Sequence, residues 1–364
     1  MFIPSPKNNS MQQIRSLDLA RGFTVFMIAP VHTMLLYSKP YVRETLLGKI
    51  FAFVAEGPGA QLFMIIMGIL FALSTQKSFN QNCKRALFLL LVGYALNITK
   101  FVLPHYFSWL PISLLHDLDI DSSQKDYIEL LSIGDILQFA AFATIALHSI
   151  ARIKYAEFVS LCLALAYCIL SPYFWDIHFR NDALDYLSQL FGGAPPRVFF
   201  PFFPWIVYPL IGLSIGIFIK KSKDPQPAFW VCRDVGWCLI ICATILTHIL
   251  PIYPYSSFYR TYPFDTLIHI GIVLVTLSLW QWIAQNVKPN NLFDVLTYLS
   301  QNITSIYIIQ WILICWLLPL IGYQQLGTAG TLCAIATTSF LTISLSFFFK
   351  KGNKKEKHDK IPID

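Results

Sequence analysis

The residues Asp18, Arg21 and His32 place three side chains that can bind anions or move protons in the first strongly apolar stretch of the sequence. An α-helix turns about 100° and rises about 1.5 Å per residue, so the step from Arg21 to His32 covers about three turns and returns to nearly the same face. Ionisable groups are costly inside a bilayer and usually mark a site that faces a packed interior or a water-filled cavity. The sequence therefore predicts that the chemistry lies on this helix face.

Arg21 and His32 each have a functional and a structural interpretation. The guanidinium of Arg21 suits a phosphate-bearing ligand, because it binds phosphate through two nitrogens and keeps its charge. The alternative for Arg21 is an interfacial charge paired with Asp18, three residues earlier on the same face. His32 can act as a general base toward a hydroxyl or amine, or as a nucleophile that carries a transferred group. The alternative for His32 is a histidine that packs against a neighbouring helix.

The composition indicates a polytopic membrane protein. The chain has 364 residues, of which 55% are hydrophobic and 13% charged, whereas about a quarter of the residues of soluble domains are charged. Apolar blocks of about 20 residues recur, and this is the length that crosses a bilayer as a helix. In lipid a helix satisfies its own backbone hydrogen bonds, so the predicted fold class is all-α.

Several function classes find no support in the sequence. No P-loop, HExxH, GxSxG or dinucleotide-binding motif occurs in a plausible context, which argues against ATP-driven and zinc-hydrolase chemistry. The eight cysteines form no CxxC pair and no Cys/His cluster with metal-ligand spacing, so we expect no metal site. The net charge of +7 comes from short connections and the tail, so we expect no nucleic-acid partner.

Ten apolar segments, each bracketed by Pro, Gly or charged residues, organise the chain. They cover residues 18–38, 58–76, 85–104, 128–149, 155–175, 203–220, 230–250, 264–286, 298–321 and 328–349. Lys and Arg gather in alternate connections, including Lys77, and in the tail, which predicts that both termini are cytoplasmic. The longer loops 39–57, 105–127, 176–202 and 251–263 then face outward, and loop 105–127 carries four aspartates that include Asp121. The predicted domains are a cytoplasmic segment at 1–15, a membrane domain at 16–349 and a basic tail at 350–364.

The sequence resembles two related groups of membrane acyltransferases. Leu17-Asp18 followed by Arg21, ten further residues and His32 resembles the first-helix motif of the type 3 membrane acyltransferases. Residues 62–74, 132–138, 200–216 and 300–307 are similar, in the family's order, to helices of the heparan-α-glucosaminide N-acetyltransferase group and its bacterial relatives. The resemblance implies a helical membrane fold and acyl transfer from acetyl-CoA, or a similar thioester, to a saccharide or related acceptor. It also implies that Asp18 and Arg21 hold the phosphates of a cytosolic acyl-CoA donor and that His32 is the base or the acyl carrier.

The assignment of His32 follows the type 3 pattern. The lysosomal N-acetyltransferases have Asn at the position of His32 and a histidine in the loop after the first helix, whereas loop 39–57 of this chain contains no histidine. The chain also lacks the Ser-Leu-x-x-Glu element of the type 3 enzymes, and Phe139 stands where the other group often has Arg. The outer-loop residues His105 and His116 are the alternatives to His32.

Asp135 is the second predicted catalytic residue. Asp135 and Gln138 lie three residues apart and are predicted to share a face of the fourth helix. Asp135 would orient a protonated His32 or position the acceptor, and a salt bridge to another helix is the alternative. Gln138 is predicted to lie on the acceptor path.

Four further polar residues complete the predicted path of the acceptor. Glu56 precedes Gly-Pro-Gly in a predicted turn at the outer surface, where an acceptor amine or hydroxyl could meet a carboxylate. His269 lies near the outer end of the eighth segment, close to Asp265. Gln301 and Asn302 in the predicted ninth helix would line the path, or would only bind helices together.

The sequence as a whole predicts an integral-membrane acyltransferase of the bacterial inner membrane that modifies envelope glycans. Its co-substrate would be acetyl-CoA, or another acyl-CoA, with no permanently bound cofactor. The expected partners are a saccharide or lipid-linked acceptor and membrane lipid, and a homo-oligomer is compatible with the sequence. The alternative is a transporter or flippase of a glycan precursor, lipid or organic anion, which would use Arg21, His32 and Asp135 as a substrate or proton site. A non-catalytic assembly protein is the third interpretation.

Overall fold

The computed structural model describes residues 14–74, 78–120, 126–254 and 256–358. Residues 1–13 of the predicted N-terminal segment, Lys77 and Asp121 lie outside the described residues, as does the basic tail after His358.

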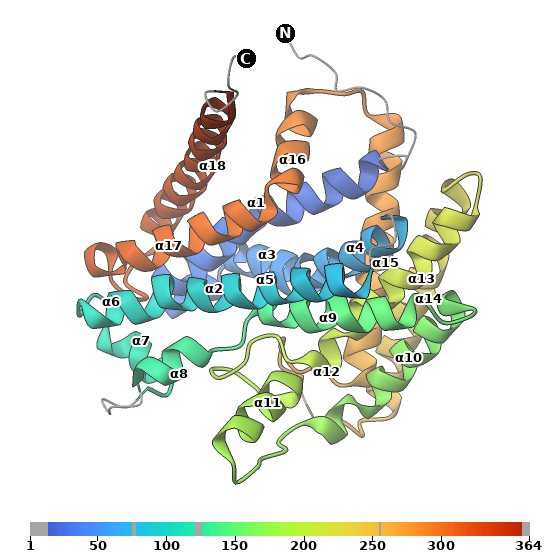
Figure 1. Ribbon diagram of the computed structural model, residues 1–364, viewed down its shortest axis with the longest axis horizontal. Helices are drawn as coiled ribbons and strands as arrows, with labels where there is room; N and C mark the ends of the chain where they lie inside the picture. The colour runs from blue at the N-terminus through green and yellow to red at the C-terminus, as the bar shows by residue number, and fades with distance from the viewer. Residues whose placement is uncertain (1–13, 75–77, 121–125, 255, 359–364) are drawn as a thin grey trace.

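The regular structure of the described part is helical. In chain order the helices are α1 (Arg15–Tyr37), α2 (Pro40–Glu44), α3 (Leu46–Val54), η1 (Ala55–Gly59), α4 (Ala60–Leu73), α5 (Phe79–Asn97), η2 (Ile98–Val102), α6 (Leu103–Tyr106), α7 (Ile112–Asp117), α8 (Asp126–Ser132), α9 (Ile136–Ile150), α10 (Ala156–Leu170), η3 (Ser171–Phe174), α11 (Asp182–Gly192), α12 (Phe202–Trp205), α13 (Val207–Lys221), α14 (Gln226–Ile249), α15 (Pro263–Asn286), α16 (Asn291–Gln301), α17 (Ile303–Ile321) and α18 (Thr328–His358). Figure 1 shows α5 and α9 side by side across the middle of the molecule, with α11 projecting beyond the other helices.

Within the described ranges, nine helical stretches are long and apolar enough to cross a membrane. Some of them join neighbouring helices: α3, η1 and α4 form the stretch Leu46–Leu73, and α5, η2 and α6 form Phe79–Tyr106. Helix α9 is a shorter apolar helix of 15 residues. These findings confirm the predicted all-α fold with about ten membrane helices.

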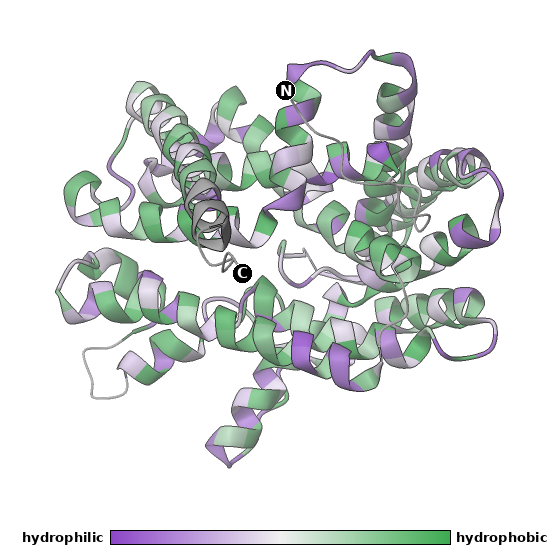
Figure 2. Cartoon of the chain, turned by 45° about the horizontal axis from the view of Figure 1, so that its top comes forward, coloured by the Kyte–Doolittle hydropathy of each residue, from purple (hydrophilic) through white to green (hydrophobic). Residues whose placement is uncertain are grey.

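The hydropathy of the surface is that of a protein that contacts lipid. Figure 2 shows hydrophobic residues along the length of the helices and many of the hydrophilic ones at helix ends and in connections. Large apolar side chains such as Leu46, Ile241 and Phe340 are exposed. A membrane supplies the apolar surroundings that these side chains need, so the chain is an integral membrane protein.

Close helix packing depends on glycines in α4 and α13. A Cβ atom on Gly68 would lie 2.1 Å from the carbonyl oxygen of Pro209, and one on Gly212 would lie 2.0 Å from that of Ile65. Gly216, four residues after Gly212, also packs on α4. Small residues at this spacing let two membrane helices approach backbone to backbone. The pair forms the centre of the largest hydrophobic cluster.

Two predicted features of the chain differ in the structure. Glu56 lies in the π-helix η1, which joins α3 to α4, and not in a turn. Pro58 has no N–H for an α-helical bond, and a wider π turn takes up this irregularity without ending the helix. The predicted ninth helix is broken at Asn302, whose φ of −120° and ψ of 25° end α16 before α17 begins.

Asp135 caps a helix and does not lie inside one. Gly134 pairs with the segment at Val198: its N–H donates to the carbonyl of Arg197 at 2.9 Å, and its carbonyl accepts from Phe199 at 2.8 Å. This pairing draws the backbone out of the helix, so the predicted segment 128–149 is split into α8 and α9. Asp135 then accepts from its neighbour's N–H at the start of α9, and the Gln138 side chain accepts from the N–H of Asp135 at 3.2 Å. Asp135 and Gln138 therefore contact each other as the two members of a capping box.

Candidate functional site

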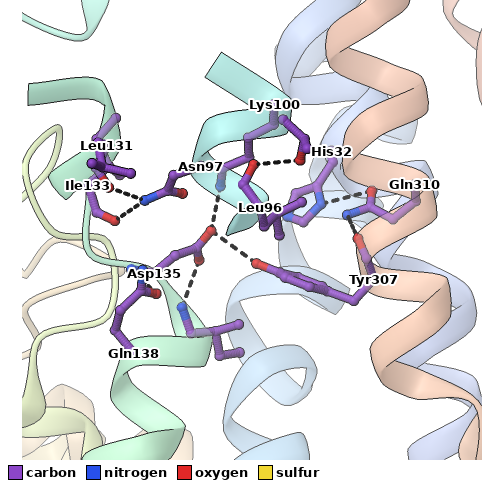
Figure 3. A network of polar contacts seen from close by, with 12 residues as sticks. His32, Leu96, Asn97, Lys100, Leu131, Ile133, Asp135, Gln138, Tyr307 and Gln310 are labelled. Atoms are coloured by element: carbon purple, nitrogen blue, oxygen red, sulfur yellow. Dashed lines mark hydrogen bonds and ion pairs between the residues drawn. The ribbon is translucent and has the colours of Figure 1, made fainter. Parts of the chain in front are cut away.

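Three helical elements bring an ion pair together in the interior. The Lys100 Nζ atom, from η2, lies 2.7 Å from Oδ2 of Asp135, and the Tyr307 hydroxyl, from α17, donates to the same oxygen at 3.0 Å. In Figure 3 both side chains converge on the carboxylate. The Lys100 side chain is 2% exposed and that of Asp135 is 10% exposed. A buried pair of this kind is stable only when both partners are present.

His32 of α1 lies beside this ion pair. Two residues of α17 determine the orientation of its ring. Its Nδ1 atom is 3.2 Å from Oε1 of Gln310, and its ring stacks on Trp311 with 4.1 Å between the centroids. The Gln310 amide nitrogen donates to the carbonyl of Tyr307, which orients the amide so that its oxygen faces His32. An amide oxygen can only accept, so Nδ1 carries the proton and Nε2 is the basic nitrogen.

His32 and Asp135 belong to one network without touching directly. Among the described residues the two side chains share no hydrogen bond. Lys100 connects them, since its ammonium lies 4.5 Å from the ring centroid of Trp311, the ring on which His32 stacks. Tyr307 makes the second connection, because its hydroxyl binds Asp135 and its carbonyl binds Gln310.

Two buried side-chain amide atoms near the ion pair have no hydrogen-bond partner among the described residues. They are Oδ1 of Asn97 and Nε2 of Gln138. Asn97 uses its amide nitrogen to bind the carbonyls of Leu131 and Ile133, at 2.8 and 2.7 Å. Buried polar groups are almost always satisfied by protein, water or ligand. The region around Asp135 can therefore accept a further polar group.

Asp18 and Arg21 form a second cluster, which includes Ser300 of α16. The Arg21 Nη2 atom lies 3.1 Å from Oδ1 of Asp18, Nε donates to the Ser300 hydroxyl at 2.8 Å, and that hydroxyl donates to Asp18 at 2.9 Å. Gly22 lets the helices approach, since a Cβ there would lie 2.0 Å from the carbonyl oxygen of Leu296. The predicted ion pair between Arg21 and Asp18 is therefore present. The Arg21 side chain is 21% exposed, so solvent or a ligand can still reach it.

A cavity of about 240 Å³ lies between η1, the 251–262 connection and the start of α15. Its lining includes Glu56, Asp265 and His269. The Nδ1 atom of His269 is buried and has no partner among the described residues, and the Ser256 hydroxyl donates to Asp265. Two carboxylates and an unpaired imidazole nitrogen make this an acidic cavity, which suits an amine or hydroxyl donor.

Tyr259 belongs to the loop that borders the acidic cavity, and its neighbour Phe258 lines that cavity. Burial raises the pKa of its hydroxyl, and the carboxylates of Asp135 and Glu56 raise this pKa further, so both lie within electrostatic range. Trp205 Nε1 donates to the Tyr259 carbonyl at 2.9 Å, and the next residue, Arg260, donates to the carbonyl of Gly193 at 2.8 Å. The loop that carries Tyr259 is therefore anchored on both sides.

Comparison with known proteins gives the family. Residues 13–257 match the family model described as heparan-alpha-glucosaminide N-acetyltransferase, catalytic. The chain belongs to this family. No curated protein and no solved structure matches it. The resemblance to the heparan-α-glucosaminide N-acetyltransferase group is confirmed, and the chain is a membrane acetyltransferase by family.

The matched part of this acetyltransferase does not contain the whole site. It includes His32, Lys100 and Asp135, whereas α15 to α17 follow it and supply His269, Ser300, Tyr307 and Gln310. The site thus combines the family's catalytic region with helices from the rest of the chain.

The remaining predicted residues lie apart from the acidic cavity. Gln301 is exposed at the end of α16, and Asn302 donates to the carbonyl of Tyr298 at 2.7 Å, next to Ser300. His105 of α6 lies 3.7 Å from Asp126 of α8. His116 of α7 is exposed. Within the described part of the chain, no group of His, Cys, Asp or Glu could hold a metal ion.

Sequence reasoning missed Lys100, Tyr307 and Tyr259. A signal existed for Lys100, because it is the one cation of the apolar run from Ala86 to Leu103, and an intramembrane charge marks a functional site by default. Tyr307 and Tyr259 carry no such signal, since tyrosines are common throughout this chain.

Proposed function

We propose that this chain transfers an acetyl group from acetyl-CoA, or a similar cytosolic thioester, to a saccharide or related acceptor of the cell envelope, in a bacterial inner membrane. The observation that carries the proposal is the geometry of His32, whose Nδ1–H is directed at Gln310 so that Nε2 is left as a base inside the catalytic region of an acetyltransferase family. Imidazole is the most common general base in proteins.

The donor would approach from the side of Asp18 and Arg21. Asp18 and Ser300 hold the Arg21 guanidinium through Nη2 and Nε, which leaves Nη1 for a phosphate oxygen of the donor. Gln301 and Asn302 lie next to Ser300, so they would act on this side and not on the acceptor path.

The acetyl transfer would take place at His32. The acceptor amine or hydroxyl attacks the thioester carbonyl carbon, a new N–C or O–C bond forms, and the C–S bond breaks. Nε2 of His32 takes the acceptor's proton and returns it to the departing thiolate. Lys100, held by Asp135, supplies positive charge near the oxyanion that develops on the carbonyl. In the second route Nε2 first accepts the acetyl group and then passes it to the acceptor.

The acceptor would enter through the acidic cavity. Glu56 and Asp265 attract a protonated amine, and His269 offers a further polar contact. The carboxylates of Asp135 and Glu56 both act on the Tyr259 hydroxyl, and Nε2 of Gln138 is buried without a partner among the described residues. These residues would form a polar route from the cavity toward the ion pair, as expected of a path for a hydroxyl-rich acceptor.

One observation favours the rival function, a transporter or flippase. The Lys100–Asp135 pair is buried at the start of α9, a short helix that begins inside the protein, and transporters place ion and substrate sites at such broken helices. Purified protein incubated with labelled acetyl-CoA separates the two functions. The acyltransferase releases CoA thiol or labels itself at His32, and a transporter does neither.

The two routes of transfer also give different results in that experiment. If His32 carries the acetyl group, label remains on the protein when the acceptor is omitted, and His32→Asn removes it. If His32 is only a base, the wild-type protein stays unlabelled and thiol release requires the acceptor.

A further inference from the structure

A basic pocket of about 400 Å³ lies at the opposite end of α9 from Asp135. It is formed where α4, α9 and α13 end and where α10 begins, with α5 at its side. Its volume is in the range of pockets that hold small ligands. Its lining is distinct from the residues of the acetyl-transfer site, so it needs a separate explanation.

The pocket carries an excess of positive charge. Its charged lining residues are Arg85, Arg152, Lys220, Lys221 and Glu157. Lys221 pairs with Glu157, and the Lys220 ammonium donates to the carbonyl of Ala72 at 3.0 Å. Within the described residues neither guanidinium has a hydrogen bond or an ion pair. Guanidinium is the side chain best suited to bind phosphate oxygens.

His148 adds an unsatisfied donor to this pocket. The residue lines the pocket and is 5% exposed. The amide nitrogen of Asn82 donates to its Nδ1 at 2.8 Å, so Nε2 carries the proton. That Nε2–H is buried without a partner among the described residues. Burying an unpaired donor costs stability, and an anion in the pocket would relieve this cost.

The start of α10 provides backbone donors at the same place. Ala156 and Glu157, its first residues, line the pocket, and the N-cap residue Tyr155 makes no side-chain capping bond. The first N–H groups of a helix point outward with a positive partial charge, which favours phosphate. Cationic side chains, a buried unpaired N–H and an uncapped helix start therefore converge on one pocket.

We propose that this pocket binds a phosphate-bearing anion. Such a phosphate belongs either to the nucleotide end of the acyl-CoA donor or to the headgroup of an anionic phospholipid. The donor assignment rests on the proposed function, whereas anion binding itself does not. Because Arg21 is already held by Asp18 and Ser300, a donor with several phosphates needs more cations than that cluster offers.

The test measures binding to the purified full chain with two probes. Adenosine 3′,5′-bisphosphate represents the nucleotide end of the donor, and phosphatidylglycerol, compared with phosphatidylcholine, represents the anionic lipid. The variant Arg85→Gln/Arg152→Gln removes the two unpaired guanidiniums. The matched control Lys84→Gln/Lys223→Gln removes the same charge from exposed neighbours outside the lining.

We expect one of the probes to bind the wild-type chain, and the Arg85→Gln/Arg152→Gln variant to bind it about tenfold more weakly. The control should bind with nearly unchanged affinity. Nucleotide binding assigns the pocket to the donor, and selective phosphatidylglycerol binding assigns it to lipid. Equal weakening in both double variants, or no saturable binding of either probe, would overturn the proposal.

A second measurement does not depend on the variants. Inorganic phosphate should displace the bound probe from the wild-type chain, whereas chloride at the same ionic strength should not. Displacement by both salts to the same extent would show that the probe is held only by general electrostatic attraction, which salt screens, and would contradict the proposal. Since the readout is binding, a failed acetyl-transfer assay leaves this result intact.

Discussion

At the scale of single residues, one amide decides which nitrogen of His32 is basic. Gln310 accepts from Nδ1 and is itself oriented by the carbonyl of Tyr307, so two contacts from α17 act on one residue of α1. We expect Gln310→Ala to lower kcat about tenfold by releasing the ring, and His32→Asn to lower it at least about 100-fold. Steady-state thiol release measures both effects. An unchanged kcat in His32→Asn would remove this residue from the mechanism.

Arg21 tests whether the shape of its side chain matters as well as its charge. Arg21→Lys keeps a cation but loses the fork that binds Asp18, Ser300 and a phosphate together. We expect KM for acetyl-CoA to rise about tenfold with little loss of folded protein. Arg233→Lys, an exposed residue paired with its neighbour Asp234, is the control and should leave KM unchanged. Equal KM values in the two variants would support the purely interfacial interpretation of Arg21.

The Lys100–Asp135 pair makes a prediction about stability. Removing one partner leaves a buried charge, so Lys100→Met should lower the free energy of unfolding by about 3–5 kcal/mol. The double variant Lys100→Met/Asp135→Asn should recover part of this loss, because no unpaired charge remains. Thermal unfolding in detergent measures the difference. A double variant as unstable as the sum of the single ones would argue that the two side chains act independently.

At the scale of helices, backbone contact between α4 and α13 determines the packing around the site. Gly212→Ala would place a Cβ atom 2.0 Å from a backbone oxygen, so the helices must separate. We expect a lower unfolding temperature for this variant. Gly330→Ala in α18 is the control, since its Cβ atom would lie at an ordinary 3.4 Å from Cδ2 of Leu326 and alanine favours the helix. Similar unfolding temperatures for both variants would show that α4 and α13 can separate at little cost.

The sequence predicted those parts of the site that depend on local spacing. The Asp18–Arg21 pair lies within one helical turn, and the apolar blocks define the membrane helices directly. The sequence also points to Asp135 as a candidate, but its position as a helix cap depends on pairing between Gly134 and the segment at Val198, which lies far away in the chain. The partners of Lys100 and the position of Tyr259 likewise depend on contacts between distant segments.

At the scale of the whole molecule, transfer from a cytosolic donor to an envelope acceptor requires two sides with different tasks. The Asp18–Arg21 cluster and the basic pocket would face the cytosol, while the acidic cavity at Glu56 and His269 would face outward. Single cysteines introduced at exposed Lys223 and Tyr173 of a variant without native cysteines test this arrangement. A membrane-impermeant maleimide added to whole cells should label position 173 and not position 223. The reverse labelling would invert the proposed direction of transfer.

The most direct measurement of the central claim is CoA thiol release by the purified full chain. The protein is incubated with acetyl-CoA and a panel of amino sugars and neutral sugars, with His32→Asn as the matched control. We expect the wild-type chain to produce acetylated sugar and an equal amount of free thiol, and the control to produce at least about 100-fold less of both. If the folded wild-type chain releases no more thiol than the control, acetyl transfer at His32 is contradicted.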